Sequence, residues 1–164
     1  MKNPDEASLR LLVAELDKDV RDLAQLQEEN RRAEMRIREG STDSLDIAAL
    51  AYTIHNLYCL MENYFLRIAK TFENNVGGDT WHRDLVRRMT IEVDGVRPAL
   101  LDDETAAKID ELRAFRHVFR NVYQAPLRAE RVRELQAAVP AIVEAFRRSH
   151  LVFVEKIRII FTLT

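Results

Sequence analysis

An apolar seam between Ser44 and Glu73 constrains the fold more strongly than any other feature of the sequence. Apolar side chains recur in it at spacings of three and four residues, at Ile47, Leu50, Ile54, Leu57, Met61, Tyr64 and Ile68. This spacing places them along one face of an α-helix, which other helices must cover. The preceding run Gly40-Ser41-Thr42-Asp43 is typical of a helix end followed by the N-cap of the next helix. The segment therefore predicts a long helix that contributes to a helical core.

The remaining sequence predicts further helices. With only four glycines and four prolines in 164 residues, the chain has few turn signals and long elements between them. We expect a first helix from Asp5 or Ser8, whose apolar stripe fades after Leu26 and whose distal half is solvated. The other expected helices cover about Trp81 to Glu92, Thr105 to Tyr123, and Arg128 to Phe161, the last with a kink at Pro140. The sequence thus predicts an all-α, antiparallel bundle of four to five helices in a single domain, residues 1–164.

Charge and cysteine content exclude several classes of protein. The formal net charge is −2, so any contact with a nucleic acid must come from a local basic patch. Cys59 is the only cysteine, which excludes an intrachain disulfide and favours a reducing compartment. The N-terminal residues lack the apolar run of a signal peptide, and no apolar stretch is long enough to span a bilayer. We therefore expect a cytoplasmic protein that does not enter a membrane.

The segment Glu111–Gln124 carries the most informative polar pattern. Its basic residues recur at helical spacing and fall on about a third of the helix circumference; they are Arg113, Arg116, His117 and Arg120. The apolar residues fall on the opposite side and are expected to face the core; they are Leu112, Phe115, Val118, Phe119 and Val122. Guanidinium groups match phosphate oxygens with a planar fork of donors, so the basic face suits a phosphate ligand. A merely solvated helix face has the same pattern and is the alternative interpretation.

Other kinds of site have weaker support. His55 and Cys59 are four residues apart on one helix face, but no second pair at ligand spacing accompanies them. A helix–helix contact is therefore favoured over a metal site, and Cys59, with no basic neighbour in sequence, is expected in the core. His82 beside Trp81 is expected to pack or to cap a helix, and His150 is left unassigned. No glycine-rich phosphate loop or nucleophile elbow is present, and we expect neither a metal nor a cofactor.

The basic face has the chemistry of a metal-independent ribonuclease. Cleavage of RNA by its own 2′-hydroxyl group requires a positioned phosphate, stabilisation of the charge that develops in the transition state, and a proton acceptor or donor. Arginine supplies the first two, and histidine usually supplies the third. Helical periodicity alone does not select this activity.

The run Arg-Ala-Phe-Arg-His-Val-Phe-Arg-Asn-Val-Tyr, residues 113–123, resembles the signature of the HEPN superfamily, and in particular of the HepT-like ribonuclease toxins. Supporting segments lie in the same order along the chain, at Asn56-Leu57-Tyr58 with Glu62, Arg67-Ile68-Ala69, Trp81–Leu85 and Arg97-Pro98. The resemblance covers approximately residues 51–127. It implies an all-helical, HEPN-like domain that forms a homodimer. In such a dimer two Arg-(four to six residues)-His motifs share one cleft and cleave RNA without a metal.

The resemblance also implies a partner and a mode of control. Such toxins are typically encoded with a minimal nucleotidyltransferase antitoxin, which adds AMP to a tyrosine two residues after the motif histidine. Carried over to this chain, Arg116 takes the position of the motif arginine, Asn121 that of the motif histidine, and Tyr123 that of the modified tyrosine. Arg113 and Arg120 would bind flanking phosphates of the RNA substrate.

Asn121 is a departure from the family pattern. An amide can hydrogen-bond a phosphate or a hydroxyl group but cannot exchange a proton near neutral pH, so the departure predicts impaired cleavage. His117 is the secondary candidate for proton transfer, although only three residues separate it from Arg113. Positions 116 and 121 lie about 140° apart on a straight helix, so a site using both needs a helix end or a contribution across a dimer. The alternative function is a non-catalytic helical module that binds a nucleotidyltransferase or a nucleotide.

Overall fold

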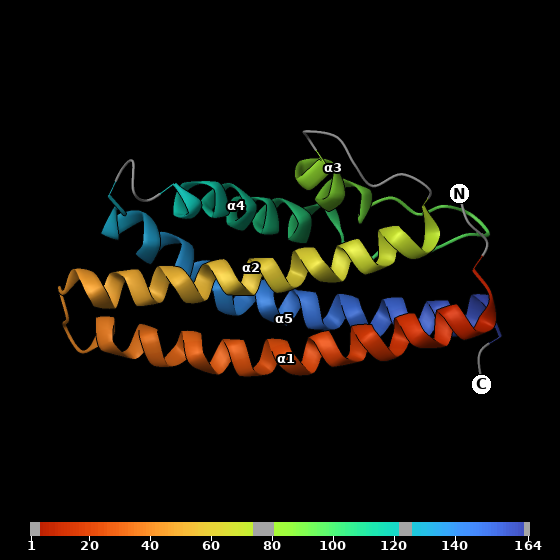
Figure 1. The fold of residues 1–164 in the computed structure, drawn as a ribbon, viewed down its shortest axis with the longest axis horizontal. Coiled ribbons are helices and arrows are strands. Elements are labelled where there is room, and N and C mark those ends of the chain that lie inside the picture. The colour runs from red at the N-terminus through yellow and green to blue at the C-terminus, as the bar shows by residue number, and fades with distance from the viewer. Residues whose placement is uncertain (1–3, 74–80, 122–125, 163–164) are drawn as a thin grey trace.

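The computed structural model describes residues 4–73, 81–121 and 126–162, which contain five α-helices and no β-strand (Figure 1). The helices are α1 (Glu6–Arg38), α2 (Ser44–Phe72), α3 (Trp81–Arg88), α4 (Asp103–Arg120) and α5 (Ala129–Ile160). The prediction of an all-α bundle of four to five helices is confirmed. Within the described residues, no helix has the length and apolar character needed to cross a bilayer.

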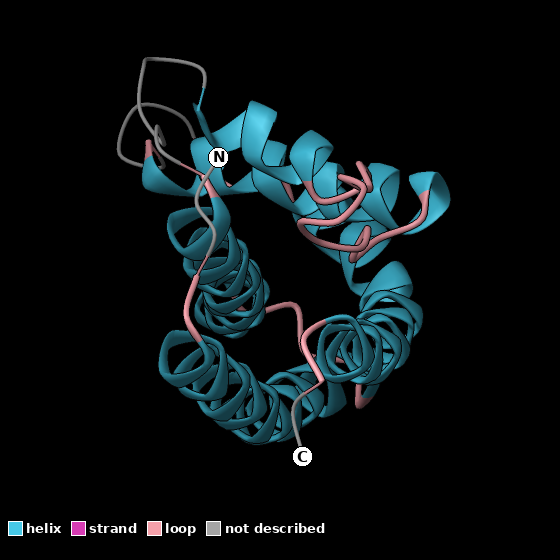
Figure 2. Cartoon of the chain, turned by 90° about the vertical axis from the view of Figure 1, so that its right-hand side faces the viewer, coloured by secondary structure: helices cyan, strands magenta, loops and turns pink. Residues whose placement is uncertain are grey.

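The four long helices run alternately in opposite directions. Figure 1 shows α2 returning beside α1, α4 running back along α2, and α5 returning again. Figure 2, turned by 90°, looks along these helices and shows them gathered around a common axis. The second helix, α2, contacts each of the other four helices. The apolar seam that predicted it is buried throughout, and none of its residues is more than 5 % exposed.

Short polar side chains fix where the helices begin. The carboxylates of Asp5, Asp43 and Asp102 accept hydrogen bonds from the backbone N–H groups of the first turns of α1, α2 and α4. These bonds satisfy donors that have no partner inside a helix. At the other end of α1, Gly40 has a φ of 94°, a left-handed conformation that glycine adopts without a steric penalty. The expected boundaries around Asp5 and Gly40–Asp43 are therefore confirmed.

The distal half of α1 is anchored at Asn30, so the prediction of a solvated distal half was wrong at this position. The Asn30 side chain is buried and donates to Thr53 Oγ1 of α2 at 2.9 Å. Asn30 and Gln136 of α5 also exchange a reciprocal pair of amide hydrogen bonds, at 2.8 and 2.9 Å. The apolar stripe fades here because a polar network takes over the packing between the three helices.

Two helix ends differ from their predicted positions. The third helix ends at Arg88 rather than near Glu92, because the carbonyl of Met89 accepts from the N–H groups of Leu100 and Leu101 instead of extending the helix. The fourth helix ends at Arg120, before the predicted end at Tyr123, a residue outside the described part of the chain. The fifth helix continues through Pro140 as one element.

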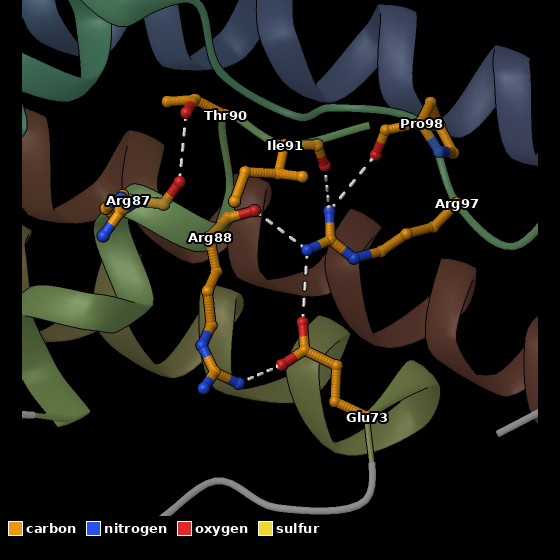
Figure 3. A network of polar contacts seen from close by, with 7 residues as sticks. All are labelled: Glu73, Arg87, Arg88, Thr90, Ile91, Arg97 and Pro98. Carbon is orange, nitrogen blue, oxygen red and sulfur yellow. Dashed lines mark hydrogen bonds and ion pairs between the residues drawn. The ribbon is translucent and has the colours of Figure 1, made fainter. Parts of the chain in front are cut away.

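A buried arginine fastens the segment after α3 to the end of α2 (Figure 3). Only 2 % of Arg97 is exposed, and its guanidinium donates to the carboxylate of Glu73 at 3.2 Å. The same group donates to the carbonyls of Arg88 at 2.8 Å and Ile91 at 3.0 Å. Glu73 also pairs with the side chain of Arg88 through its second oxygen. This network holds α3 and the following turn, and so sets the starting point of α4.

Candidate phosphate-binding site at the end of α4

Arg116 lies in the packed interface between α4 and α2 rather than on a solvated face. The core-facing row of α4 proceeds at spacings of four, three and four residues through Thr105, Ile109, Leu112 and Arg116. Only 19 % of the Arg116 side chain is exposed. Val118, predicted to face the core, is instead 52 % exposed. Leu112 and Phe115 are buried and Phe119 packs against the core, as predicted, so the prediction was wrong for Val118 and for the inward position of Arg116.

Glu62 on α2 is the partner that positions Arg116. Nη2 of Arg116 lies 3.4 Å from Oε2 of Glu62, and the Tyr58 hydroxyl group donates to Oε1 of the same carboxylate at 3.1 Å. Burial, reinforced by the negative charge of Glu62, raises the pKa of Tyr58 far above its ordinary value, so the phenol remains a donor. Nε of Arg116 is buried and has no hydrogen-bond partner among the residues that the structure describes. The guanidinium is thus held in place with donor capacity left over.

The polar residues of α2 that face this arginine form one strip at helical spacing. The strip consists of His55, Tyr58, Cys59 and Glu62. The His55 ring stacks on Phe119 of α4, with ring centroids 4.8 Å apart. Cys59 Sγ lies 3.4 Å from Nε2 of His55. Pairs at three and four residues lie side by side on a helix, so this strip presents its side chains together toward α4.

Burial and the neighbouring charges tune both members of the His55–Cys59 pair. Burial lowers the pKa of His55, and the positive charges of Arg116 and Arg120 lower it further. The negative charge of Glu62 raises it by a smaller amount. The imidazole is therefore neutral at pH 7. Burial raises the pKa of the Cys59 thiol, although a hydrogen bond with Arg116 acts in the opposite direction. The thiol is protonated near neutral pH and is not an activated nucleophile.

Cys59 is half-buried and contacts Arg116, so its expected place in the core was only partly correct. The favoured interpretation of His55 as a helix–helix contact is confirmed by its stacking on Phe119. Within the described residues, no group of three side chains from histidine, cysteine, aspartate and glutamate gathers around a point where a metal ion could bind.

Two of the other basic residues of α4 lie toward solvent, whereas Arg113 remains near the interface, with 24 % of its side chain exposed. His117 and Arg120 are exposed and belong to the last turn of the helix. Arg113 is partly buried and donates to Asp110 at 2.5 and 3.2 Å. A pair of this kind on the surface of one helix contributes about 1 kcal/mol or less, so a phosphate group can compete with Asp110 for the guanidinium. Arg113 and Arg120 therefore flank Arg116 on the more accessible side.

Asn121 occupies the C-cap of α4. Its backbone N–H donates to the carbonyl of Val118 at 3.1 Å, and its side-chain Nδ2 donates to the carbonyl of His117 at 2.7 Å. The amide thus satisfies a carbonyl that the end of the helix leaves without a partner. The helix end expected for a site using positions 116 and 121 is present. Tyr123, like Val122 and Gln124, lies outside the described residues.

Two further segments that carried the resemblance have structural contacts of their own. Arg67 of α2 pairs with Asp19 at 2.9 Å and with Glu15 at 3.0 Å, which ties α2 to α1. Arg97 fastens the turn before α4, as described above.

His150, left unassigned from the sequence, is buried on α5 and lies 2.9 Å from the Tyr64 hydroxyl oxygen and 3.2 Å from Asp17. The side chain of His82 is not among those that the structure describes.

The sequence did not identify Glu62 or His55 as site residues. The signal was present in two rows that each lie along one face of a helix: positions 105, 109, 112 and 116 on one helix, and positions 55, 58, 59 and 62 on another. An arginine at the end of the first row and a carboxylate at the end of the second predict a buried ion pair only once the two helices are known to be neighbours.

A comparison with protein families identifies the chain. The family model described as HepT-like protein matches residues 49–157, about two thirds of the chain. The match begins inside α2 and ends inside α5, so it includes the strip on α2 and the basic segment of α4, whereas α1 precedes it. No curated protein and no solved structure matches the chain. The chain belongs to the HepT-like protein family.

Proposed function

We propose that this protein is a HepT-like toxin that cleaves RNA without a metal ion, with Arg116 as the residue that binds the scissile phosphate. The observation that carries the proposal is the position of the Arg116 guanidinium. Its Nη2 lies 3.4 Å from Oε2 of Glu62, its Nε is buried, and 19 % of the side chain is exposed to solvent. A guanidinium that is pre-positioned in this way binds a phosphate at little entropic cost.

The flanking arginines extend the site along an RNA strand. Arg113 and Arg120 lie three residues before and four residues after Arg116 on the same helix, and each takes a neighbouring phosphate group in the proposal. The formal net charge of the whole chain is −2, so binding depends on this local patch and weakens as salt is raised. We infer that His117, exposed beside them, assists as a secondary donor.

Cleavage proceeds by attack of the ribose 2′-oxygen on the adjacent phosphorus. The P–O5′ bond breaks, and the products are a 2′,3′-cyclic phosphate and a 5′-hydroxyl group. Arg116 stabilises the negative charge that builds up on the non-bridging oxygens. Asn121 stands at the position that resembles the motif histidine, where an amide can orient a hydroxyl group but cannot exchange a proton near pH 7. The proposed activity is therefore weaker than that of a chain with histidine at this position.

The proposed regulator is a minimal nucleotidyltransferase antitoxin that transfers AMP to the hydroxyl group of Tyr123. This residue follows the C-cap Asn121 by two positions in the sequence. The added phosphate would compete with RNA for the basic residues of the last turn.

The proposed assembly is a homodimer in which the ends of the two α4 helices share a cleft. Val118 and Tyr52 support this arrangement, because both are large apolar residues, both are more than half exposed, and they lie on the two helices that form the site. Exposed apolar side chains of this kind are available for contact with a second chain.

A non-catalytic module that binds a nucleotidyltransferase or a nucleotide is the second candidate. The observation in its favour is that the Asn121 amide already has a structural role, in donating to the His117 carbonyl at 2.7 Å. In that case the arginines would serve as a docking surface alone.

The test of the proposed activity uses the purified full-length chain and an RNA substrate. Arg116→Ala is expected to reduce cleavage by about 10²-fold or more, the effect typical of removing one donor to a developing oxyanion. Arg148→Ala, on an exposed arginine of α5, is the matched control and should leave the rate unchanged. Equal rates for wild type and Arg116→Ala would rule out the proposed activity.

Incubation with the nucleotidyltransferase and ATP separates the two candidate functions. Mass spectrometry showing one AMP on Tyr123, together with loss of RNA cleavage, supports the toxin. A tight complex without an adduct and without RNA cleavage at any stage supports the binding module.

A further inference from the structure

The strip on α2 brings an imidazole to the arginine site from a second helix. His55 and Glu62 are two helical turns apart on α2 and lie on either side of Tyr58 and Cys59, which separate them along the strip. At one end Glu62 pairs with Arg116. At the other end His55 stacks on Phe119, which lies three residues after Arg116 and directly before Arg120. The stacking fixes the ring next to both arginines.

Cys59 connects the imidazole to the phosphate-binding arginine. Its Sγ lies 3.4 Å from Nε2 of His55, and Arg116 is near enough to lower the pKa of the same thiol. His55, Cys59 and Arg116 therefore form a continuous set of contacts. His55 is half-buried, so its ring is held by its neighbours and also reaches the surface.

We propose that His55 is the proton acceptor of the RNA cleavage reaction, in the role that Asn121 cannot fill. The inference rests on the proposed function and adds a residue from α2 to the site. The neutral imidazole takes the proton from the 2′-hydroxyl group as the 2′-oxygen bonds to phosphorus. The P–O5′ bond breaks, the leaving 5′-oxygen takes a proton from water, and the imidazolium then returns its proton to the hydroxide that remains.

The surroundings of His55 suit a proton acceptor near neutral pH. The groups that face it are Arg116 and Arg120 on α4 and Glu62 and Cys59 on α2. Burial and the two arginines keep the ring neutral, which is the form that can accept a proton. By comparison, His117 is exposed on α4, and its carbonyl rather than its ring is engaged by Asn121.

Two substitutions at position 55 separate proton transfer from packing. His55→Phe keeps an aromatic ring to stack on Phe119 but removes both ring nitrogens, and His55→Gln keeps polarity without the ring. We expect both to reduce the rate of RNA cleavage by about 10²-fold to 10⁴-fold, the contribution typical of a general base. His55→Phe should retain the thermal stability of the wild type. Cleavage at the wild-type rate by a folded His55→Phe protein would overturn the proposal. A loss of cleavage rate in His117→Gln, with no loss in His55→Gln, would overturn it as well.

The pH dependence of kcat/KM tests whether His55 transfers a proton, because a purely structural role would leave that dependence unchanged. In the wild type, kcat/KM should fall as pH drops through the lowered pKa of His55, because the imidazolium cannot accept a proton. This acidic limb should be absent from the residual activity of His55→Phe. An unchanged limb in that variant assigns the titration to another group and overturns the role of His55.

A binding experiment without cleavage distinguishes a failure of the proposed role of His55 from a failure of the proposed RNA-cleaving function. The His55 ring signal in an NMR spectrum of the full chain should shift when a non-cleavable 2′-deoxy oligonucleotide is added, and the shift should be lost in Arg116→Ala. Absence of a shift in a chain that cleaves RNA with dependence on Arg116 overturns the role of His55 alone. If the wild-type chain cleaves no RNA at all, the proposed function fails and the role of His55 fails with it.

Discussion

Nη2 of Arg116 on α4 lies 3.4 Å from Oε2 of Glu62 on α2, and only 7 % of the Glu62 side chain is exposed. A carboxylate at this depth is compensated by the arginine and by the Tyr58 hydroxyl group together. The pair therefore has two roles, because it joins two helices of the bundle and sets the position of the group that we propose binds phosphate.

Breaking this pair should cost stability. Glu62→Gln leaves the Arg116 guanidinium without its negative partner in a site that is mostly shielded from water, and we expect unfolding to become easier by about 1–3 kcal/mol. The measurement is chemical denaturation with an unchanged m-value. The double variant Glu62→Gln/Arg116→Met should lose less than the sum of the two single changes, since neither charge is then left alone. A loss under about 0.5 kcal/mol for Glu62→Gln would contradict the structural role.

Stability should fall when the protein is acidified past the ordinary pKa of histidine. Burial lowers the pKa of His150 from its usual 6.5. The negative charge of Asp17 acts in the opposite direction, and the positive charge of Arg158 lowers the pKa further. The unfolded chain therefore binds a proton at a pH where the folded chain does not, and stability declines as pH falls below 6.5 toward the lowered value. Thermal unfolding followed from neutral pH downwards measures this. The decline should be smaller in His150→Gln, and identical profiles for wild type and His150→Gln would exclude His150 as the cause.

The buried Arg97 should contribute more to the free energy of unfolding than Arg88, which pairs with the same carboxylate. Arg97→Met removes the donor to the Glu73 carboxylate and to the carbonyls of Arg88 and Ile91, at an expected cost of about 2–4 kcal/mol. Arg88→Met breaks a pair with the same Glu73, but the Arg88 side chain is 44 % exposed and the expected cost is about 1 kcal/mol or less. The denaturation midpoints of both variants measure which substitution costs more stability. A larger loss of stability for Arg88→Met than for Arg97→Met would contradict the prediction.

The proposed homodimer can be tested through Val118. In the proposed dimer the second chain covers the outer face of α4, which carries Val118, so Val118→Glu should convert the dimer to a monomer by placing an unpaired charge in the interface. Light scattering after size-exclusion chromatography gives the mass in solution. Leu151→Glu, at an exposed apolar position on α5, is the control. Dissociation by Leu151→Glu alone would move the interface to α5.

Much of the fold was predictable because its signals are local. Asp43 and Asp102 cap the helices that follow them through bonds to residues two and three positions away, so sequence alone places those ends. The seam of α2 was equally clear, because it is apolar over its whole length. The anchoring of Asn30 was not predictable, because its partner Gln136 lies 106 residues further along the chain.

The orientation of α4 shows why the site was harder to predict than the fold. Helical spacing gives the angles between side chains but not which direction points toward the neighbouring helix. Hydrophobicity alone favoured a stripe through Val118, whereas Arg116 can turn inward because Glu62 neutralises it. The resemblance named Arg116 without this geometry, and it gave no role to His55, which reaches the site from another helix.

The amide pair between Asn30 and Gln136 has a consequence for the order in which a growing chain completes its fold. As the chain leaves the ribosome, α1 and α2 emerge first and can form a hairpin, in which Asn30 already has Thr53 as a partner. The Asn30 oxygen must wait for Gln136 of α5, which is translated 106 residues later. Until then the distal part of α1 carries a polar group suited to the final interior and to water alike. The polar contact between α1 and α5 is therefore completed only after the last helix has been synthesised.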